Sequence, residues 1–403
     1  MKKILFVINT LGTGGAENSL IELIKKLDSQ KYDIYLYVLL NQGELRKKLP
    51  EYVKLLNETY DDAPVYSPIG KENISKLVRK SLFCRFGFIK QFSYIASNFF
   101  DMQSKSRISP DKLMWKTVAY GAQRFNEHFD LAVAFLEGGS AYYVSKFVNA
   151  DVKAAFMHID YSEAGYTKKL DGDCYYGFDK IYAVSKAVKD SFLRVYPDLV
   201  GKVKILENSL DREAIERLAD EGEGFTDDFD GIRILSIGRL TKQKSLEVSI
   251  EAMKILRDYK INARWYVLGE GSCRKELEKK LKKMGLSEDF LLPGNKENPY
   301  PYLKQCDLYV HASRYEGKSV AIKEAKICKR PIIATDCPGN MEQITDGYDG
   351  ILCKFSPEDI AGKIISLINN RFLSEKLSEN AGISILKDFS NPDFADEITT
   401  ILQ

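Results

Sequence analysis

Two glutamates lie on either side of the point where a short polar segment is followed by a helical pattern. In the stretch "SRYEGKSVAIKEA" (313–325), Glu316 and Glu324 lie eight positions apart. The run before it, "DLYVHAS" (307–313), is typical of a buried strand, and "SVAIKEAKICK" is typical of a helix with Ser319 as its N-cap. This spacing predicts Glu316 in the loop after the strand and Glu324 on the second turn of the helix.

The residues between the two glutamates offer backbone N–H groups. Gly317, Lys318, Ser319 and Val320 are predicted to form a concave set of donors of the kind that binds phosphate or sugar oxygens. Carboxylates on either side accept hydrogen bonds from vicinal hydroxyls. The layout suits a nucleotide-sugar, which has a sugar at each end of a diphosphate. The alternative is an ordinary pair of glutamates on a soluble helix.

A second motif carries cations. In "SIGRLTKQKS" (236–245), Arg239 and Lys244 bracket a short loop that follows an apolar run and Gly238. Two cations at such a loop predict a clamp for a diphosphate, whose charge must be held and stabilised during reaction. Basic side chains are also common on protein surfaces, which is the alternative here.

The N-terminal half has its own candidates. Gly14 and Gly15 in "NTLGTGGAE" (9–17) let a ligand approach the backbone at a helix N-terminus, although any turn of this kind needs glycine. His158 in "FMHIDYS" ends another apolar run, where an imidazole can donate a hydrogen bond to a sugar hydroxyl. A purely structural histidine is the alternative.

The stretch "LDGDCYY" (170–176) contains an Asp-x-Asp pattern that can hold a divalent cation. The residues before it, "YTKKL", do not form an apolar strand, and Arg239 with Lys244 already supplies positive charge. We therefore expect a loop there with no role in metal binding.

The elements that position these residues follow an alternating pattern. Short apolar runs alternate with helical patterns, and several runs are almost continuously apolar, as in parallel strands covered on both faces. The N-terminal runs are 2–9, 32–40, 129–137, 153–158, 180–185 and 203–208; the C-terminal ones are 232–238, 263–269, 289–294, 307–313, 331–336 and 350–353. Such alternation predicts βαβ units in doubly wound sheets, whose ligands bind beyond the carboxyl ends of the strands.

An acidic, Gly-containing break at 220–231 separates the two series. We therefore predict an α/β protein with two Rossmann-like, doubly wound domains facing each other across a cleft. The expected domains are residues 1–209, with a C-terminal helix (388–403) packing back on them, and residues 210–387.

Composition excludes several classes. The chain of 403 residues is 44% hydrophobic and 29% charged with a net charge of +2, which gives no reason to expect a nucleic-acid partner. Its seven cysteines form no CxxC pair, which favours a reducing cytoplasm over a disulfide framework. No run approaches the roughly 20 apolar residues of a membrane span.

Residues 71–124 depart from the alternation. They contain eleven Lys or Arg and three acids, interleaved with large aromatic residues. This composition predicts a surface that lies against anionic lipid at the inner face of the plasma membrane. The alternative is a helical insertion with buried aromatics and solvated lysines.

An ordered set of motifs adds a resemblance to these observations. The set comprises "GTGGAE", "MHIDYS", "AVSKAVKDSF", "ILENSLD", "GRLTKQK", "LGEGSCRKELE", "ASRYEGKSVAIKEA" and "DGYDGILC". It resembles the retaining glycosyltransferases of family 4, which have the GT-B fold, and the E-x7-E element is its most specific part. The similarity leaves 60–125 as the family's variable acceptor-side region.

The resemblance implies a role for each donor-site residue. It places Glu316 on hydroxyls of the transferred sugar, Glu324 on the nucleotide ribose, and Arg239 with Lys244 on the diphosphate. Two departures are Lys318–Ser319, where the family often has Phe-Pro, and Ser245, where it commonly has Gly. These departures bear on donor-sugar selectivity and loop geometry.

The resemblance also implies a catalytic set of His158, Arg239, Lys244 and Glu316, with His158 near the reacting carbon. Gly14 and Gly15 lie against donor phosphates or acceptor in the family. Its retaining members are described as reacting on one face of the sugar, the leaving phosphate helping to deprotonate the acceptor hydroxyl, so no protein nucleophile is expected.

The implied activity is transfer of a hexose-type sugar from a nucleotide-sugar to a hydroxyl of a glycan or lipid-linked acceptor in cell-surface polysaccharide synthesis. A UDP-linked donor and no metal or other cofactor are expected. The alternative from another class is a non-catalytic GT-B subunit that scaffolds a partner transferase. A sugar-nucleotide epimerase or phosphorylase agrees less well with the motif order, and a dinucleotide oxidoreductase lacks GxGxxG.

Overall fold

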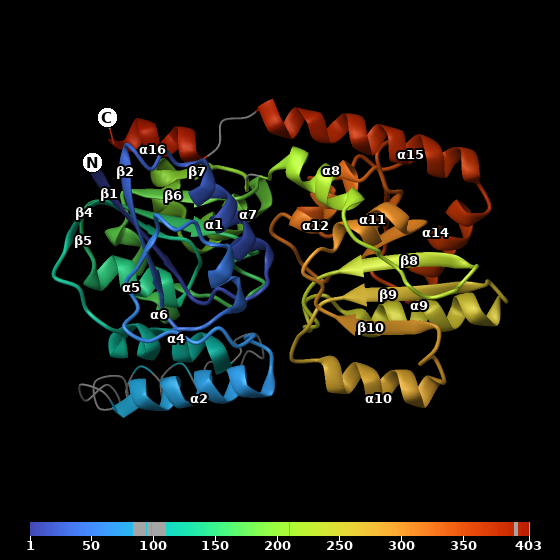
Figure 1. The fold of residues 1–403 in the computed structure, drawn as a ribbon, viewed down its shortest axis with the longest axis horizontal. Helices are drawn as coiled ribbons and strands as arrows, with labels where there is room; N and C mark the ends of the chain where they lie inside the picture. The colour runs from blue at the N-terminus through green and yellow to red at the C-terminus, as the bar shows by residue number, and fades with distance from the viewer. Residues whose placement is uncertain (84–93, 95–97, 99–109, 209, 391–393, 403) are drawn as a thin grey trace. The chain divides into compact units, whose positions relative to one another are not determined.

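The computed structural model describes residues 1–83, 94, 98, 110–208, 210–390 and 394–402. The chain divides into two compact units (Figure 1). The N-terminal unit comprises Met1–Ser209 with Pro392–Gln403, and the C-terminal unit comprises Leu210–Asn391. Each unit is built on a parallel sheet, so the predicted fold class of two Rossmann-like α/β domains is confirmed.

The N-terminal unit contains a seven-stranded sheet in the order β3-β2-β1-β4-β5-β6-β7. The strands are β1 (Lys2–Ile8), β2 (Tyr32–Val38), β3 (Lys54–Leu55), β4 (His128–Ala134), β5 (Asn149–Met157), β6 (Lys180–Ala183) and β7 (Val203–Ile205). Residues Ile4 to Ile8 of β1 are fully buried, as expected for a central strand covered on both faces.

Helices connect and cover these strands. They are α1 (Gly15–Lys26), α2 (Pro68–Phe83), α4 (Pro110–Gly121), α5 (Gly139–Phe147), α6 (Lys168–Asp171), α7 (Lys186–Val195) and α16 (Phe394–Leu402), with short 3-10 turns η1 (Glu44–Lys48), η3 (Cys174–Gly177) and η4 (Pro197–Lys202). Helix α7 starts where the Ser185 hydroxyl accepts the N–H of Val188.

Helix α16, at the end of the chain, packs on the N-terminal unit. The Tyr182 hydroxyl donates to Glu397 at 2.9 Å. The Phe394 ring meets Phe156 edge to face, with 4.7 Å between ring centroids. The last helix thus completes the core of a domain that begins nearly 400 residues earlier in the sequence.

The C-terminal unit contains a six-stranded sheet in the order β10-β9-β8-β11-β12-β13. The strands are β8 (Ile232–Ile237), β9 (Ala263–Leu268), β10 (Phe290–Gly294), β11 (Leu308–His311), β12 (Ile332–Thr335) and β13 (Ile351–Cys353). The helices are α8 (Arg212–Asp220), α9 (Leu246–Asp258), α10 (Arg274–Met284), α11 (Tyr300–Gln305), α12 (Val320–Ile327), α13 (Pro338–Met341), α14 (Pro357–Ile368) and α15 (Arg371–Ser384), followed by η5 (Ile385–Ser390).

Consecutive residues of β8 enter two different cores. Ile234 belongs to the core that also contains residues of α9, α10 and α14, whereas Leu235 belongs to the core with residues of α11 and α12. Because side chains of a strand alternate between faces, a strand buried on both must be apolar at nearly every position. This explains the continuous apolar runs in the sequence.

In both sheets the order of strands reverses once. The chain moves outward from β1 and returns to place β4 beside it, and β8 and β11 are related in the same way. In open parallel sheets, ligands bind outside the carboxyl ends of the strands at such a switch point. The loops after β1, β4, β8 and β11 are therefore the places to look for a site.

The basic and aromatic segment 71–124 is described only in part. Helices α2 and α4 are described, whereas 84–93, 95–97 and 99–109, which hold most of the aromatic residues behind the membrane-surface prediction, lie outside the described residues. Among the helices that the structure does describe, none has the length and apolar character needed to cross a membrane.

Candidate functional site

At the switch point of the C-terminal unit, an ion pair joins the loops after β8 and β11. The ammonium of Lys244 contacts Oε1 of Glu316, and the two side chains are only 16% and 9% exposed. Strands β8 and β11 are hydrogen-bonded parallel neighbours, so their carboxyl ends bring these loops together. The structure therefore brings together two of the predicted site residues.

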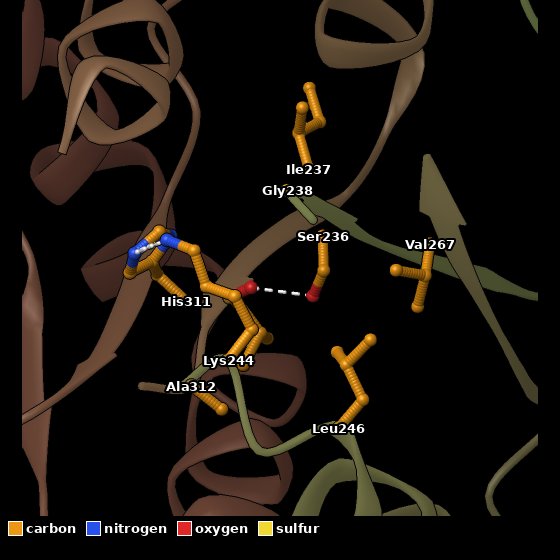
Figure 2. Close-up of a pocket in the computed structure, with 9 residues that line it drawn as sticks. Ser236, Ile237, Gly238, Lys244, Leu246, Val267, His311 and Ala312 are labelled. Atoms are coloured by element: carbon orange, nitrogen blue, oxygen red, sulfur yellow. Dashed lines mark hydrogen bonds between the residues drawn. The ribbon is translucent and has the colours of Figure 1, made fainter. Parts of the chain in front are cut away.

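Two further side chains hold this pair in place. The Ser313 hydroxyl donates to Glu316 Oε1 at 2.9 Å, and Nε2 of His311 lies 3.1 Å from the Lys244 ammonium (Figure 2). Burial alone would raise the pKa of Glu316, but the charge of Lys244 outweighs burial and holds that pKa well below its usual range. Glu316 is therefore an ionised acceptor.

Lys244 and His311 line a pocket at the end of the sheet (Figure 2). Gly238 is also in the lining, and a Cβ there would lie 3.2 Å from Cε of Lys244, so glycine leaves room for the lysine stem. In the same lining, the Ser236 hydroxyl donates to the Val310 carbonyl at 2.6 Å and links β8 to β11. The remaining lining residues are Ile237, Leu246, Val267 and Ala312.

Glu316 and Glu324 occupy the places predicted for them. Glu316 lies in the loop after β11, and Glu324 lies on the second turn of α12. The Tyr300 hydroxyl donates to Oε1 of Glu324 at 3.1 Å. Burial raises the pKa of Glu324 to about 7, and the Tyr300 hydrogen bond opposes this shift.

The segment between the glutamates leads into α12, which begins at Val320. Ser319 stands at the N-cap position, as predicted, but its side chain makes no capping hydrogen bond. A Cβ at Gly339 would lie 2.5 Å from the Gly317 carbonyl oxygen, so the start of α13 packs directly against this segment. Lys318 belongs to the same short connection between β11 and α12.

The loop after β8 also carries Arg239, whose side chain is exposed. Ser245, where the resembled family commonly has glycine, adopts the left-handed conformation with φ of +47°. This conformation favours glycine, and the Ser245 hydroxyl stabilises it by donating to the Lys242 carbonyl at 3.0 Å.

In the N-terminal unit, His158 directly follows β5. Its ring stacks on the ring of Phe156, with 5.8 Å between the centroids. Both ring nitrogens are buried, and neither makes a hydrogen bond to a described residue. Burial lowers the pKa of His158 to about 4, opposed in part by the backbone of Phe135. The imidazole is therefore neutral at physiological pH and has hydrogen-bonding capacity to offer a ligand.

Two buried polar residues at the same sheet edge, Glu137 and Asn9, were not predicted from the sequence. The Glu137 carboxylate, after β4, accepts the backbone N–H groups of His158 and of Ile159, the latter at 2.9 Å. The Asn9 amide, after β1, donates to the Glu137 carbonyl at 3.1 Å. Glu137 ends the apolar run 129–137, and an acid in that position was the available signal.

The glycine loop after β1 is surrounded by carboxylates. Gly14 is the N-cap of α1, Gly15 is its first residue, and the Glu17 carboxylate lies beside Gly14. The backbone N–H and the hydroxyl of Thr13 both donate to Glu44, at 3.0 Å and 2.6 Å. The Glu44 carboxylate therefore holds the residue before the glycine pair in place.

The Asp-x-Asp pattern has a structural explanation. Asp171 is the last residue of the short helix α6, so the prediction of a loop there was wrong for this residue. Its buried carboxylate accepts the hydroxyls of Tyr142, Tyr161 and Tyr196 at 2.7, 2.6 and 2.9 Å. Within the described part of the chain, no group of three or more His, Cys, Asp or Glu side chains is arranged to hold a metal ion.

The chain is similar in sequence to known glycosyltransferases. Residues 227–382 match the family model "Glycosyl transferases group 1". An uncharacterized glycosyltransferase of Methanocaldococcus jannaschii is 31% identical over 215 residues, 53% of this chain and 56% of that protein, so this match spans about half of that relative.

A longer match is to the Campylobacter jejuni N-acetylgalactosamine-N,N'-diacetylbacillosaminyl-diphospho-undecaprenol 4-alpha-N-acetylgalactosaminyltransferase. It is 27% identical over 369 residues, covering 89% of this chain and 88% of the relative. The poly(ribitol-phosphate) alpha-N-acetylglucosaminyltransferase of Staphylococcus aureus is 28% identical over 163 residues, 40% of this chain and 33% of the relative.

Solved structures show the fold. HepE of Anabaena, in complex with UDP and glucose, superimposes with a TM-score of 0.68 at 16% identity, over 99% of this chain and 98% of HepE. TarM superimposes with a TM-score of 0.67 at 15% identity, over 100% and 99% of the two chains. Residues 227–382 thus resemble the group 1 glycosyltransferases in sequence, and the chain has the fold of GT-B glycosyltransferases.

Proposed function

We propose that the chain transfers a hexose-type sugar from a UDP-linked donor to a hydroxyl of a glycan or lipid-linked acceptor in cell-surface polysaccharide synthesis, with retention at the anomeric carbon. The observation that carries this proposal is the Lys244–Glu316 pair at the β8/β11 switch point of the region similar to group 1 glycosyltransferases. In this proposal Lys244 is the cation for the diphosphate, and Glu316 beside it is the ionised acceptor for sugar hydroxyls.

The charges fit the demands of the reaction. Negative charge grows on the diphosphate as the bond to the sugar breaks, and preorganised cations in a partly dry site stabilise it. Lys244 and Arg239 take this role in our proposal, Glu316 and Glu324 bind hydroxyls of the sugar and of the ribose, and His158 donates to the transferred sugar. The leaving phosphate accepts the proton of the attacking hydroxyl on the same face of the sugar.

We propose that no metal ion takes part. Lys244 and Arg239 supply the positive charge that a divalent cation supplies in metal-dependent transferases. The Asp171 carboxylate, the strongest sequence candidate for a metal ligand, is buried and already accepts hydrogen bonds from three tyrosines.

The acceptor class rests on relatives and on charge. The names of the Campylobacter and Staphylococcus relatives contain an undecaprenyl diphosphate and a poly(ribitol phosphate), respectively. Helix α2 exposes the cations Lys71, Lys76, Arg79 and Lys80. These charges support a peripheral, cytoplasmic enzyme that works beside an anionic membrane surface.

A transfer assay tests the proposal. The purified chain is incubated with UDP-, GDP- and ADP-sugars in EDTA or in magnesium, with lipid-linked and free glycan acceptors, and the product anomer is determined by NMR. We expect transfer from UDP-sugars in EDTA, with the α-anomeric configuration of the donor kept. Inversion would overturn the retaining mechanism, and no turnover of any donor would favour the scaffolding subunit.

A further inference from the structure

We infer that His311, on β11, is a positioning residue for Lys244 that holds its ammonium through a neutral, directional hydrogen bond. This inference rests on the proposed function, in which Lys244 binds the donor diphosphate. His311 is 2% exposed and lies on the pocket wall, with Nε2 toward Lys244 at 3.1 Å and Nδ1 toward the Tyr309 hydroxyl at 3.1 Å.

The partners define the tautomer of the ring. An ammonium group has donors and no acceptor, so Nε2 of His311 must present its lone pair to Lys244. The proton of the neutral ring is then on Nδ1, where it donates to the Tyr309 oxygen. A doubly protonated ring would turn a second cation toward Lys244 and remove this hydrogen bond.

The charged groups around the ring agree with this state. Lys244 faces His311 from the loop after β8, and Glu316 faces it from the loop after β11, 3.5 Å from Nε2. Burial and the Lys244 charge lower the pKa of His311, and Glu316 opposes them. Tyr309 is the other titratable neighbour, and burial raises its pKa well above the usual range, so its hydroxyl stays neutral.

The arrangement gives Lys244 two different anchors. Glu316 balances its charge, and His311 fixes its direction without carrying charge. When a diphosphate binds, it competes with Glu316 for the Lys244 charge, but it does not need to displace His311. His311 thus keeps Lys244 in position while the anionic partner of the Lys244 ammonium changes from Glu316 to the donor diphosphate.

The tautomer can be measured without any nucleotide. The chain contains three histidines, so two-bond ¹⁵N–¹H spectra of histidine-labelled protein contain three ring patterns, and His311→Gln identifies one of them. We expect the Nδ1–H tautomer of His311, and a higher His311 pKa in Lys244→Met than in the wild type. An Nε2–H tautomer, or the same rise in Lys242→Met, an exposed lysine of the same loop, would overturn the inference.

Donor affinity gives a second readout. We expect His311→Leu to weaken UDP-glucose binding about tenfold in a calorimetric titration, and His311→Gln, whose amide oxygen can accept from Lys244, to restore most of the loss. Equal affinities for the wild type and His311→Leu would overturn the positioning role. If the wild type binds no UDP-glucose, the proposed donor fails, and the tautomer measurement decides the inference alone.

Discussion

Lys244 and Glu316 form a nearly buried ion pair across 72 positions of the sequence. The pair exists because β8 and β11 are neighbours in the sheet, although β9 and β10 lie between them in the chain. Each residue was expected to bind a different part of one ligand. The structure adds that, without the ligand, they neutralise each other.

The first prediction concerns the stability of this pair. Lys244→Met and Glu316→Gln should each lower the free energy of unfolding of the C-terminal unit by roughly 1–3 kcal/mol, because each leaves a poorly solvated partner unpaired. The double variant should lose less than the sum, by about 1 kcal/mol or more. Urea unfolding of the four proteins measures this coupling.

A surface pair provides the control for that cycle. Lys254 and Asp258 pair within helix α9, where both side chains are accessible. Their cycle should show a coupling of less than about 0.5 kcal/mol. Equal couplings in the two cycles would mean that the Lys244–Glu316 contact is only a surface ion pair.

The second prediction concerns pH and Glu324. Its pKa is raised from 4.5 to about 7, so over this interval the folded protein keeps a proton that the unfolded chain has lost. The contribution of Glu324 to stability therefore falls as pH rises through this interval. In our proposal the ionised form of Glu324 accepts hydrogen bonds from ribose hydroxyls, so UDP-glucose affinity should rise between about pH 6 and pH 8.

A pair of variants isolates this effect. Glu324→Gln should flatten the rise in affinity, whereas Glu379→Gln, an exposed glutamate on α15, should leave it unchanged. UDP-glucose is the suitable probe because its diphosphate diester does not titrate in this range. A rise that persists in Glu324→Gln would show that another group is responsible.

The third prediction concerns His158. His158→Phe keeps a ring against Phe135 and Phe156 but loses both nitrogens, so stability should change little. Loss of the one proposed hydrogen bond between neutral groups, worth roughly 0.5–1.5 kcal/mol, should lower kcat/KM by about 2- to 10-fold. The exposed His128, changed to Gln, is the control. An unchanged kcat/KM in His158→Phe would show that His158 only packs in the core and does not contact the sugar.

The fourth prediction tests whether Asp171 of the Asp-x-Asp pattern has a structural role or binds a metal ion. Asp171→Ala should lower the Tm of the N-terminal unit by several degrees, because three buried tyrosine hydroxyls lose their acceptor. Asp173→Ala, at an exposed position, should have little effect. Both outcomes should be the same in magnesium and in EDTA. A Tm of the wild type that depends on magnesium and loses this dependence in Asp171→Ala would contradict the structural role.

The predictable parts of the fold are those with a local signal. The continuous apolar runs locate the strands of both sheets to within a few residues, because burial on both faces leaves few polar positions. The edge strand β3 has two residues, Lys54 and Leu55, which is too short for any periodic pattern. Helix α6 is similarly short, with four residues capped by Thr167, and it was predicted as a loop.

The elements that carry single site residues could be predicted from the sequence, but the contacts between site residues could not. Glu316 and Glu324 occupy their predicted elements because a strand end and a helical period both appear in the local sequence. The contact of Glu316 with Lys244 depends on which strands are neighbours, and that is a property of the whole sheet. His311 was not predicted because it lies inside the apolar run 307–313, and its contact with Lys244 depends on the order of the strands.

In our proposal, Lys244 belongs to a nucleotide-sugar site that works without a metal ion. A calorimetric titration in EDTA of UDP, GDP, ADP and their sugar conjugates into the wild type, Lys244→Met and Lys242→Met tests it most directly. We expect the UDP series to bind the wild type and Lys242→Met, and to bind Lys244→Met about tenfold more weakly or worse. Equal binding to all three proteins, or no nucleotide binding by the wild type, would contradict it.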